Sequence, residues 1–171
     1  MSTHRPKIKI PFEPIDIVME LVSVTFLLLM WLHVIVNYSE LPDTVATHFN
    51  SAGVPDDYGS KYFLWFLPIL STLMYLGIFW INRYPHLHNY MANITEKNAV
   101  DYYKLSTRTL RIVNLFCVLL FAYISYKIVK GAKEEFTDLG WGFIYVVITI
   151  SIILPIILIG YQLKLKKKYN G

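Results

Sequence analysis

Long apolar runs separated by polar segments dominate the hydropathy pattern of the chain. About 20 residues at a rise of 1.5 Å per residue cross a hydrocarbon layer of roughly 30 Å. The runs long enough to do so are residues 17–36, 62–81, 110–128 and 141–161. Lipid offers no partner for backbone N–H and C=O groups, so each run is predicted to be helical. The pattern therefore predicts an all-α integral membrane protein, a bundle of four transmembrane helices.

The polar segments divide the chain further. After the second run, apolar residues return at helical spacing from Thr95 onward, which predicts a third helix that begins near Glu96 and extends beyond its apolar run. The third and fourth runs are joined by a short segment, so their helices are expected to be antiparallel neighbours. The predicted divisions are a cytoplasmic tail at 1–14, a helix–loop–helix module at 15–81 with its loop at 38–61, a cytoplasmic loop with a helical extension at 82–109, the third and fourth helices at 110–161, and a basic tail at 162–171.

Composition and charge support this prediction and add an orientation. Hydrophobic residues make up 55% of the 171 residues and charged residues 16%, against about 25% charged in soluble proteins. Of the 16 Lys and Arg residues, twelve lie in the two tails and the middle loop region, and four lie around the other two loops. The positive-inside rule then predicts a membrane protein with both termini and the middle loop in the cytoplasm and the loop at residues 38–61 facing outward. The basic residues flank helix ends, which indicates topology and lipid headgroups and no nucleic-acid partner.

The outward loop at residues 38–61 carries the clearest local pattern outside the spans. Residues 45–49 alternate at period two, and the turn-forming residues 50–53 follow. This order predicts a short β-hairpin between the first two helices. Gly53 is expected to adopt a positive φ angle, and Ser60 is expected to cap the second helix.

Catalytic motifs are absent from the sequence. It contains no HExxH, GxSxG, Gly-rich phosphate loop or CxxC, and its one cysteine is Cys117. We therefore predict no enzyme activity, no catalytic residue and no cofactor. Asp43, His48, Asp56 and Asp57 could together hold a metal or a cationic ligand. Turn formation and solvation explain the same residues, and this structural interpretation is preferred, so no metal site is predicted.

Few polar side chains lie in the predicted spans. His33 is expected to make a single polar contact to another helix or a headgroup, and Asn114 to form an interhelical hydrogen bond. Glu20 precedes the apolar stretch proper and is interpreted as interfacial. Pro68 and Pro155 each remove a backbone N–H and predict kinks in the second and fourth helices. These two prolines are the evidence for an alternative function in transport.

The outward loop also resembles a known family. The stretch LPDTVATHFNSAGVPDDYGSK, residues 41–61, is similar to the pattern LP-x-x-(I/V)-x-x-HFN-x-x-G-x-x-D-x-(aromatic)-G-x-K of the bacterial domain of unknown function 1648 (DUF1648) family. The matching positions are Leu41, Pro42, Val45, His48, Phe49, Asn50, Gly53, Asp56, Tyr58, Gly59 and Lys61. The resemblance extends to SdpI-type membrane proteins, and it implies immunity to a secreted peptide toxin and signalling by holding a repressor at the membrane. SdpI-type proteins have a second region with an RTPWT-like cytoplasmic motif. This chain lacks that region and its motif.

Three functional hypotheses follow. The leading one is a non-enzymatic inner-membrane protein whose outward hairpin recognises an extracytoplasmic ligand such as a peptide, with the lipid bilayer and a cytoplasmic protein as further partners. The residues expected to recognise this ligand or to build the loop are Pro42, His48, Phe49, Asn50, Gly53, Asp56 and Lys61. The second hypothesis is a small transporter or transport subunit. The third is a membrane enzyme or metal-site protein, which needs His48 and neighbouring carboxylates around one ion.

Overall fold

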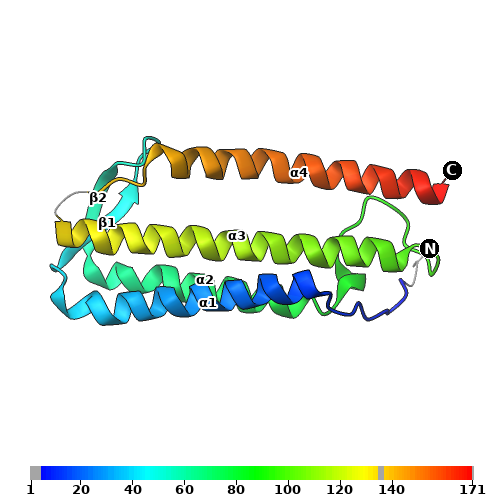
Figure 1. Cartoon of the computed structure of the whole chain (residues 1–171), viewed down its shortest axis with the longest axis horizontal. Coiled ribbons are helices and arrows are strands. Elements are labelled where there is room, and N and C mark those ends of the chain that lie inside the picture. Colours follow the sequence, from blue (N-terminus) through cyan, green and yellow to red (C-terminus); the bar gives the residue numbers. More distant parts are fainter. Residues whose placement is uncertain (1–4, 135–136, 171) are drawn as a thin grey trace.

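Four long helices and one small sheet make up the part of the chain that the computed structural model describes, residues 5–134 and 137–170. The sheet is antiparallel and two-stranded and lies between the first two helices, as predicted (Figure 1). The elements are α1 (Pro14–Asn37), η1 (Tyr38–Glu40), β1 (Thr44–Phe49), β2 (Pro55–Ser60), η2 (Lys61–Trp65), α2 (Phe66–Ile81), η3 (Pro85–Leu87), α3 (Ala99–Glu134) and α4 (Trp141–Asn170), where η marks a 3₁₀ helix. With η2 counted together with α2, the four helical segments are long and apolar enough to cross a membrane. They indicate a multi-pass membrane protein.

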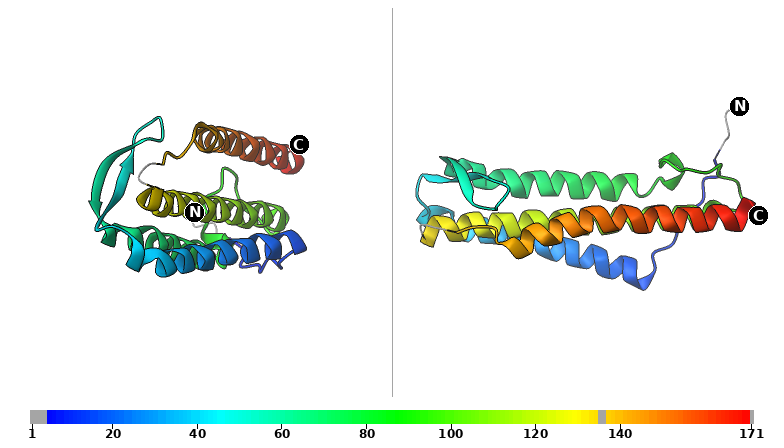
Figure 2. Two further views of the ribbon diagram at one scale, coloured as in Figure 1. Left: turned by 60° about the vertical axis from the view of Figure 1, so that its left-hand side comes forward. Right: turned by 90° about the horizontal axis from the view of Figure 1, so that it is seen from above.

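Helices α1, α2 and α3 form the packed core of the molecule. Figures 1 and 2 show α3 lying between the α1–α2 pair and α4. Near the hairpin, Val34 of α1 and Leu64 of η2 are at most 2% exposed and share one apolar cluster with residues of β1 and α3. Farther along the same helices, Leu27, Tyr75 and Val118 form a second cluster. Each helix of this core therefore buries one apolar face against the other two.

Helix α4 is packed differently. It runs antiparallel to α3 (Figure 1), and none of its side chains that the structure describes is buried. It meets α3 near its start, where Phe143 stacks on Tyr123 with ring centroids 4.7 Å apart, and near its end, where Lys168 pairs with Asp101 at 2.7 Å. Its membrane-spanning part is apolar on every side, which suits contact with lipid and selects no single face for packing. The four helices are thus a packed three-helix bundle with α4 alongside α3.

Two helix starts differ from the sequence prediction. Helix α3 begins at Ala99, slightly later than predicted, because residues 96–98 form a turn closed onto the carbonyl of Thr95. Helix α2 begins two residues before Pro68, so this proline lies in the first turn, where a backbone N–H has no intrahelical partner. Pro68 therefore removes no hydrogen bond from the middle of a helix, whereas Pro155 does lie inside α4.

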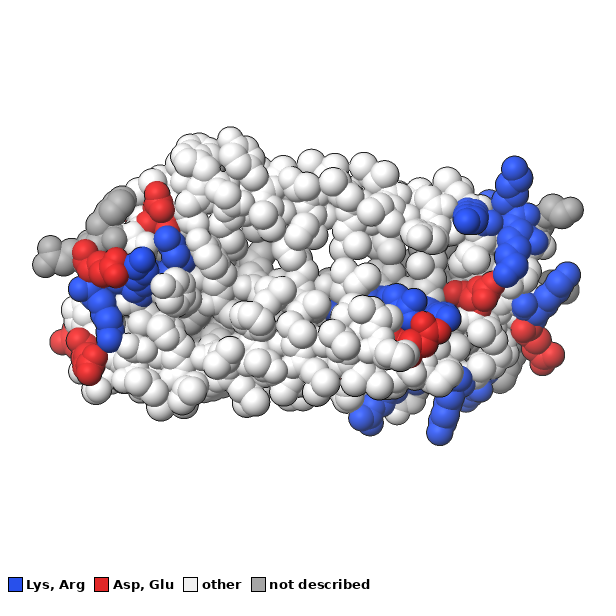
Figure 3. All heavy atoms as spheres, viewed as in Figure 1, with Lys and Arg blue, Asp and Glu red and all other residues white. Residues whose placement is uncertain are grey.

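Charged side chains gather towards the two ends of the long axis. The face shown in Figure 3 is almost free of them in its middle part, as expected for helices that cross a hydrocarbon layer. One end carries β1, β2 and the start of α4, and we call it the hairpin end. The other carries both termini and the segment at residues 82–98, and we call it the terminal end (Figure 1).

Candidate functional site

The hairpin has the turn that its sequence predicts. The side-chain oxygen of Asn50 accepts hydrogen bonds from the backbone N–H groups of Ala52 at 2.9 Å and Val54 at 3.1 Å. Gly53 has a φ of 75°, a value that favours glycine, so this prediction is confirmed. At the base, the hydroxyl of Ser60 accepts a hydrogen bond from the N–H of Tyr62 at 3.4 Å, which caps the helical turn as predicted.

The tip of the hairpin is joined to the segment before α4. The carbonyl of Gly53 accepts a hydrogen bond from the N–H of Leu139 at 2.8 Å. A Cβ atom on Gly53 would lie 3.2 Å from the side chains of both Leu139 and Ile144, so glycine is also required by close packing. The hydroxyl of Tyr123 on α3 donates to the carbonyl of the same Leu139 at 2.8 Å. One short segment therefore links the hairpin, α3 and α4.

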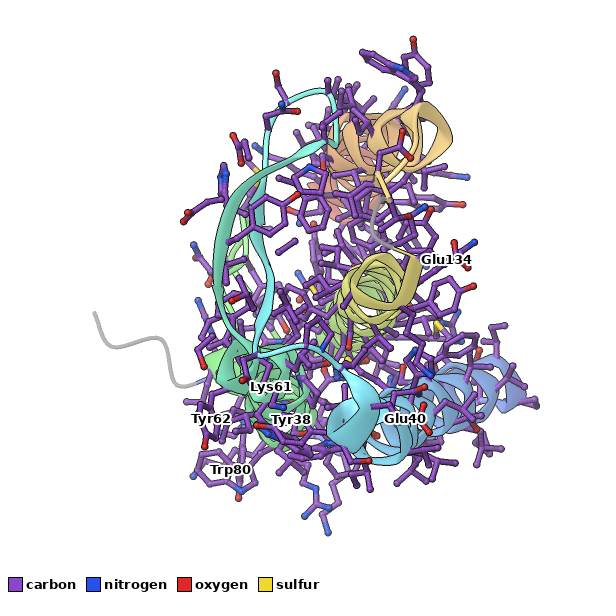
Figure 4. The ribbon with its side chains drawn as sticks, turned by 90° about the vertical axis from the view of Figure 1, so that its left-hand side faces the viewer. Tyr38, Glu40, Lys61, Tyr62, Trp80 and Glu134 are labelled. Carbon is purple, nitrogen blue, oxygen red and sulfur yellow. The ribbon has the colours of Figure 1, made fainter. Side chains whose placement is uncertain are left out.

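The polar residues predicted to form a loop site lie at separate places. His48 and Asp56 face each other across the two strands, with Nδ1 2.5 Å from Oδ1, and both side chains are exposed. At the base of the hairpin, Lys61 lies 3.0 Å from Asp43 and donates to a backbone carbonyl at 3.3 Å. Figure 4, which looks onto the hairpin end, shows Lys61 beside Tyr38, with its Nζ 5.4 Å from the ring centroid. Within the described residues, no three His, Cys, Asp or Glu side chains converge where they could hold a metal ion.

Two apolar residues, Phe49 and Pro42, were among those predicted to recognise a ligand or to build the loop. Phe49, at the end of β1, packs against the apolar cluster that contains Val34 and Val45. Pro42 follows η1 and lines a pocket between the hairpin and α3. Phe49 therefore helps to hold the sheet against the bundle, and Pro42 alone of the predicted set borders the pocket.

This pocket, which we call the hairpin pocket, has a volume of about 250 Å³. Its walls include Thr44, Val45 and Tyr58 from the hairpin and Lys127, Ile128 and Gly131 from α3. Among the described residues, Lys127 is the one charged residue that lines it, with a side chain 15% exposed and its Nζ 3.9 Å from Asp138. The sequence did not predict that Tyr58 and Lys127 border one pocket, because they lie far apart in the chain and on different elements. The available signal was that Lys127 is the one lysine inside the third apolar run, residues 110–128.

The terminal end holds a network of charged side chains that joins α1, α2 and α3. Arg111 of α3 lies 3.5 Å from Asp16 and 3.3 Å from Glu20, both on α1. The hydroxyl of Tyr75 on α2 donates to Glu20 at 2.8 Å. Asp16 and Arg111 are 2% and 6% exposed, so these charges are paired inside the protein. Glu20, interpreted from sequence as interfacial, is thus a member of a cross-helix network, which we call the terminal network.

Arg108 and Glu13 extend the network towards the surface. The Arg108 guanidinium contacts Glu13 at 2.5 Å and Asp16 at 3.2 Å. Hydrogen bonds from Lys104 and then Arg108 lower the pKa of the Glu13 carboxyl below its usual range, which keeps it ionised. Since Glu13 directly precedes α1 and the two cations belong to α3, these contacts tie the start of α1 to α3.

His88, in the segment between α2 and α3, is buried with both ring nitrogens bonded. Its Nε2 lies 3.1 Å from the carbonyl of Ile81, and its Nδ1 lies 2.7 Å from the hydroxyl of Ser106. A neutral ring that donates from Nε2 and accepts at Nδ1 satisfies both partners. Burial also lowers the pKa of His88, so the neutral form is favoured in the folded protein.

The two predicted intramembrane polar residues lie at different levels of the bundle, and only Asn114 is buried in it. His33 lines an apolar groove of about 670 Å³ between α1 and α3, with its ring 5.5 Å from that of Tyr126 and its Nδ1 3.4 Å from the amide of Asn37. Asn114 of α3 donates to the carbonyl of Tyr75 on α2 at 3.4 Å. Asn114 thus lies next to the terminal network, whereas His33 is in the half of α1 nearer the hairpin.

The four long apolar helices indicate a multi-pass membrane protein, and a β-hairpin lies between the first two of them. Residues 25–72 match the family described as Domain of unknown function (DUF1648), which confirms the predicted resemblance over this segment. An uncharacterized protein from Archaeoglobus fulgidus is 40% identical over 72 residues, which cover 37% of this chain and 39% of that protein. The chain thus matches well under half the length of this relative. No solved structure matches the chain.

Proposed function

We propose that the protein is a non-enzymatic bacterial inner-membrane protein whose hairpin end faces outward and recognises an extracytoplasmic peptide. The observation that carries the proposal is the hairpin pocket, where the inner side of a two-stranded sheet and the end of α3 enclose about 250 Å³ around Lys127. The excess of Lys and Arg at the terminal end supports this orientation through the positive-inside rule. The DUF1648 match is in keeping with it, because the segment at residues 25–72 includes the whole hairpin.

An extended peptide suits the chemistry of this end. The sheet has two strands, and no third strand pairs with them in the described part of the chain, so each strand has an outer edge able to bond to a peptide backbone. Tyr58 is 59% exposed and offers a large ring to a side chain of the peptide. Lys127 provides one positive charge, which favours a carboxylate, either an acidic side chain or the peptide's C-terminus.

The link at the hairpin tip gives such binding a route to the opposite end. The Gly53–Leu139 hydrogen bond couples the sheet to the segment that leads into α4, and α4 ends beside Asp101 at the terminal end. A ligand that moves the hairpin would therefore bias the position of α4, which few buried contacts fix. A cytoplasmic protein partner would bind differently to the terminal end after this change in the position of α4, as the resemblance to SdpI-type signalling proteins suggests.

A binding experiment tests the proposal directly. The full-length protein in nanodiscs is probed with an array of extended peptides that carry either a free or an amidated C-terminus. We expect a subset to bind and Lys127→Gln to abolish any preference for the carboxylate form, since it removes the charge in the pocket. Lys130→Gln is the matched control, because Lys130 lies one turn away on α3 and pairs with Glu134. If no peptide binds, or if both variants lose the preference equally, recognition in the hairpin pocket is wrong.

A cellular experiment tests the biological consequence. The protein is expressed in bacteria sensitive to secreted peptides, and survival is compared with that of cells expressing Lys127→Gln or the double variant His48→Ala/Asp56→Ala. Protection by the wild type that Lys127→Gln weakens would support an immunity or envelope-signalling role. Unchanged sensitivity with and without the wild-type protein, across the panel of peptides and under envelope stress, would count against that role.

A further inference from the structure

A second pocket lies at the terminal end, beside the terminal network, and we call it the terminal pocket. Its volume is about 260 Å³. It is bordered by Lys9 and Phe12 from the segment before α1, Glu20 from α1, Asn82 and Arg83 directly after α2, and Arg111 from α3. Three helices and the N-terminal segment therefore build it together, so its shape depends on the whole bundle.

Two buried polar side chains in the wall of this pocket have atoms without a hydrogen-bond partner among the described residues. Asn82 is 8% exposed, and its amide nitrogen donates to the carbonyl of Thr107 at 3.0 Å, while its Oδ1 accepts no hydrogen bond. Arg111 is 6% exposed, and its Nε makes no hydrogen bond even though it lies 3.3 Å from Glu20, because the N–H is not aligned with the carboxylate. Buried polar groups are normally paired. The residues that line the pocket thus include one buried acceptor and one buried donor whose hydrogen-bonding capacity the described protein groups leave unused.

The charges around the pocket favour an anion. Three cations and one carboxylate line it, and the charge of Arg111 is already balanced by Glu20 and Asp16. Lys9 and Arg83 make no ion pair within the described residues, so they supply positive charge that the protein leaves uncompensated. The pocket is therefore electropositive on its outer side.

Aromatic rings hold two of these cations in place. The Arg111 guanidinium lies 4.3 Å from the ring centroid of Phe12, and that of Arg83 lies 4.9 Å from the ring centroid of Phe79. Cation–π contacts of this kind restrict a guanidinium while leaving its N–H edge free to bind an anion. The arrangement is thus preorganised for a ligand with several oxygen acceptors.

We propose that the terminal pocket binds a phosphate group that carries a hydrogen-bond donor nearby. The phosphate oxygens accept from Arg83, Arg111 and Lys9, and a hydroxyl or ammonium of the ligand donates to Asn82 Oδ1. A phospholipid headgroup and a free phosphate ester share this chemistry. The pocket lies where α2 ends, next to Trp80, which is 63% exposed and is a residue type enriched at membrane–water boundaries. This position brings a headgroup within reach of the pocket from the adjacent lipid layer.

Lipid retention tests the proposal in the full-length protein. The protein is purified from nanodiscs of phosphatidylcholine with and without phosphatidylglycerol, and bound lipid is counted by native mass spectrometry. We expect selective retention of phosphatidylglycerol, reduced roughly tenfold in the double variant Lys9→Gln/Arg83→Gln, since each basic residue adds to the attraction for anionic lipid. Both side chains are exposed, so folding should be unaffected. The control is the double variant Lys166→Gln/Lys167→Gln, which removes the same charge at the same end of the molecule. We expect this variant to retain phosphatidylglycerol as the wild type does.

Two further arms identify the donor and the source of the phosphate. Phosphatidylmethanol has the charge of phosphatidylglycerol but no headgroup hydroxyl, so the wild type should retain it less, and Asn82→Leu should remove this difference. Inorganic phosphate or glycerol phosphate that displaces the lipid and raises the midpoint of thermal unfolding would point to a soluble ligand; no displacement would point to the lipid. Equal retention of all three lipids by the wild type, or equal losses in the two double variants, would overturn the proposal.

Discussion

The two ends of the bundle differ in how deeply they bury their most closely paired charged side chains. At the terminal end, Asp16 and Arg111 are at most 6% exposed and bridge α1 to α3. At the hairpin end, the pairs His48–Asp56 and Lys133–Glu40 have side chains that are 39% to 70% exposed. Exposed pairs contribute little to stability, whereas breaking a buried pair leaves an uncompensated charge inside the protein. Ion pairs are therefore expected to contribute more to the stability of the fold at the terminal end than at the hairpin end.

The hairpin end is stabilised by other means. Val45 of β1 is 2% exposed within an apolar cluster, and the backbone bond from Leu139 to Gly53 fixes the hairpin tip. The polar side chains of the hairpin end can thus bind a ligand without a loss of stability of the fold. At the terminal end, by contrast, polar side chains hold the helices together, and a ligand there would add to an existing network.

The largest effect is expected from Arg111→Gln, which leaves Asp16 and Glu20 without a buried cation. We expect a loss of about 3 kcal/mol in the free energy of unfolding, measured in detergent or lipid by reversible denaturation. Arg108→Gln is the comparison, since Arg108 is more exposed and should cost less. A loss below about 1 kcal/mol for Arg111→Gln would show that the terminal network is not structural, and the contrast between the ends would disappear.

A smaller effect is expected from Gly53→Ala at the hairpin tip. The new Cβ would be strained by the φ of 75° and crowded by Leu139 and Ile144, and we expect a loss of about 1 to 2 kcal/mol. Gly140→Ala separates the two causes, because Gly140 has a φ of 78° but open space around it. Gly160→Ala, in an open part of α4, should be neutral. Equal losses at positions 53 and 140 would show that contact between the hairpin and α4 adds nothing.

The pH dependence of stability tests the buried histidine at the terminal end. Because burial lowers the pKa of His88 below the value of about 6.5 in the unfolded chain, the unfolded chain binds a proton that the folded protein excludes. Stability is therefore full above about pH 6.5 and falls as pH decreases towards the folded-state pKa. We expect the midpoint of thermal unfolding of the wild type to fall as pH decreases through this window. We expect His88→Gln to be less stable than the wild type, with a midpoint that depends less on pH. Parallel profiles would rule out His88 as the cause.

The smallest effect is expected from the exposed pairs of the hairpin end. His48→Ala and Lys133→Gln should each change the free energy of unfolding by less than about 1 kcal/mol, measured as for Arg111→Gln. A loss of 3 kcal/mol in either would contradict the view that this end is held by apolar and backbone contacts.

The sequence predicted the elements of this fold better than their contacts. Apolar runs long enough to span a bilayer identified the four helices, and the turn residues around Gly53 identified the hairpin, because both signals are local. The partners of Glu20 and the shared pocket of Lys127 and Tyr58 could not be predicted. These residues come from distant parts of the chain, and no local pattern encodes such proximity. The hydropathy pattern also could not predict how α4 packs against the other helices, since a helix that is apolar on all sides has no preferred face.

The orientation of the hairpin is the central claim, and cysteine labelling tests it most directly. Cys117→Ala removes the one native thiol, and Ser51→Cys adds an exposed thiol at the hairpin turn. A membrane-impermeant maleimide should label this protein in intact cells, whereas a Lys167→Cys protein in the same background should be labelled only after permeabilisation. The reverse result, with Ser51→Cys protected in intact cells and Lys167→Cys labelled, would contradict the proposed outward recognition site.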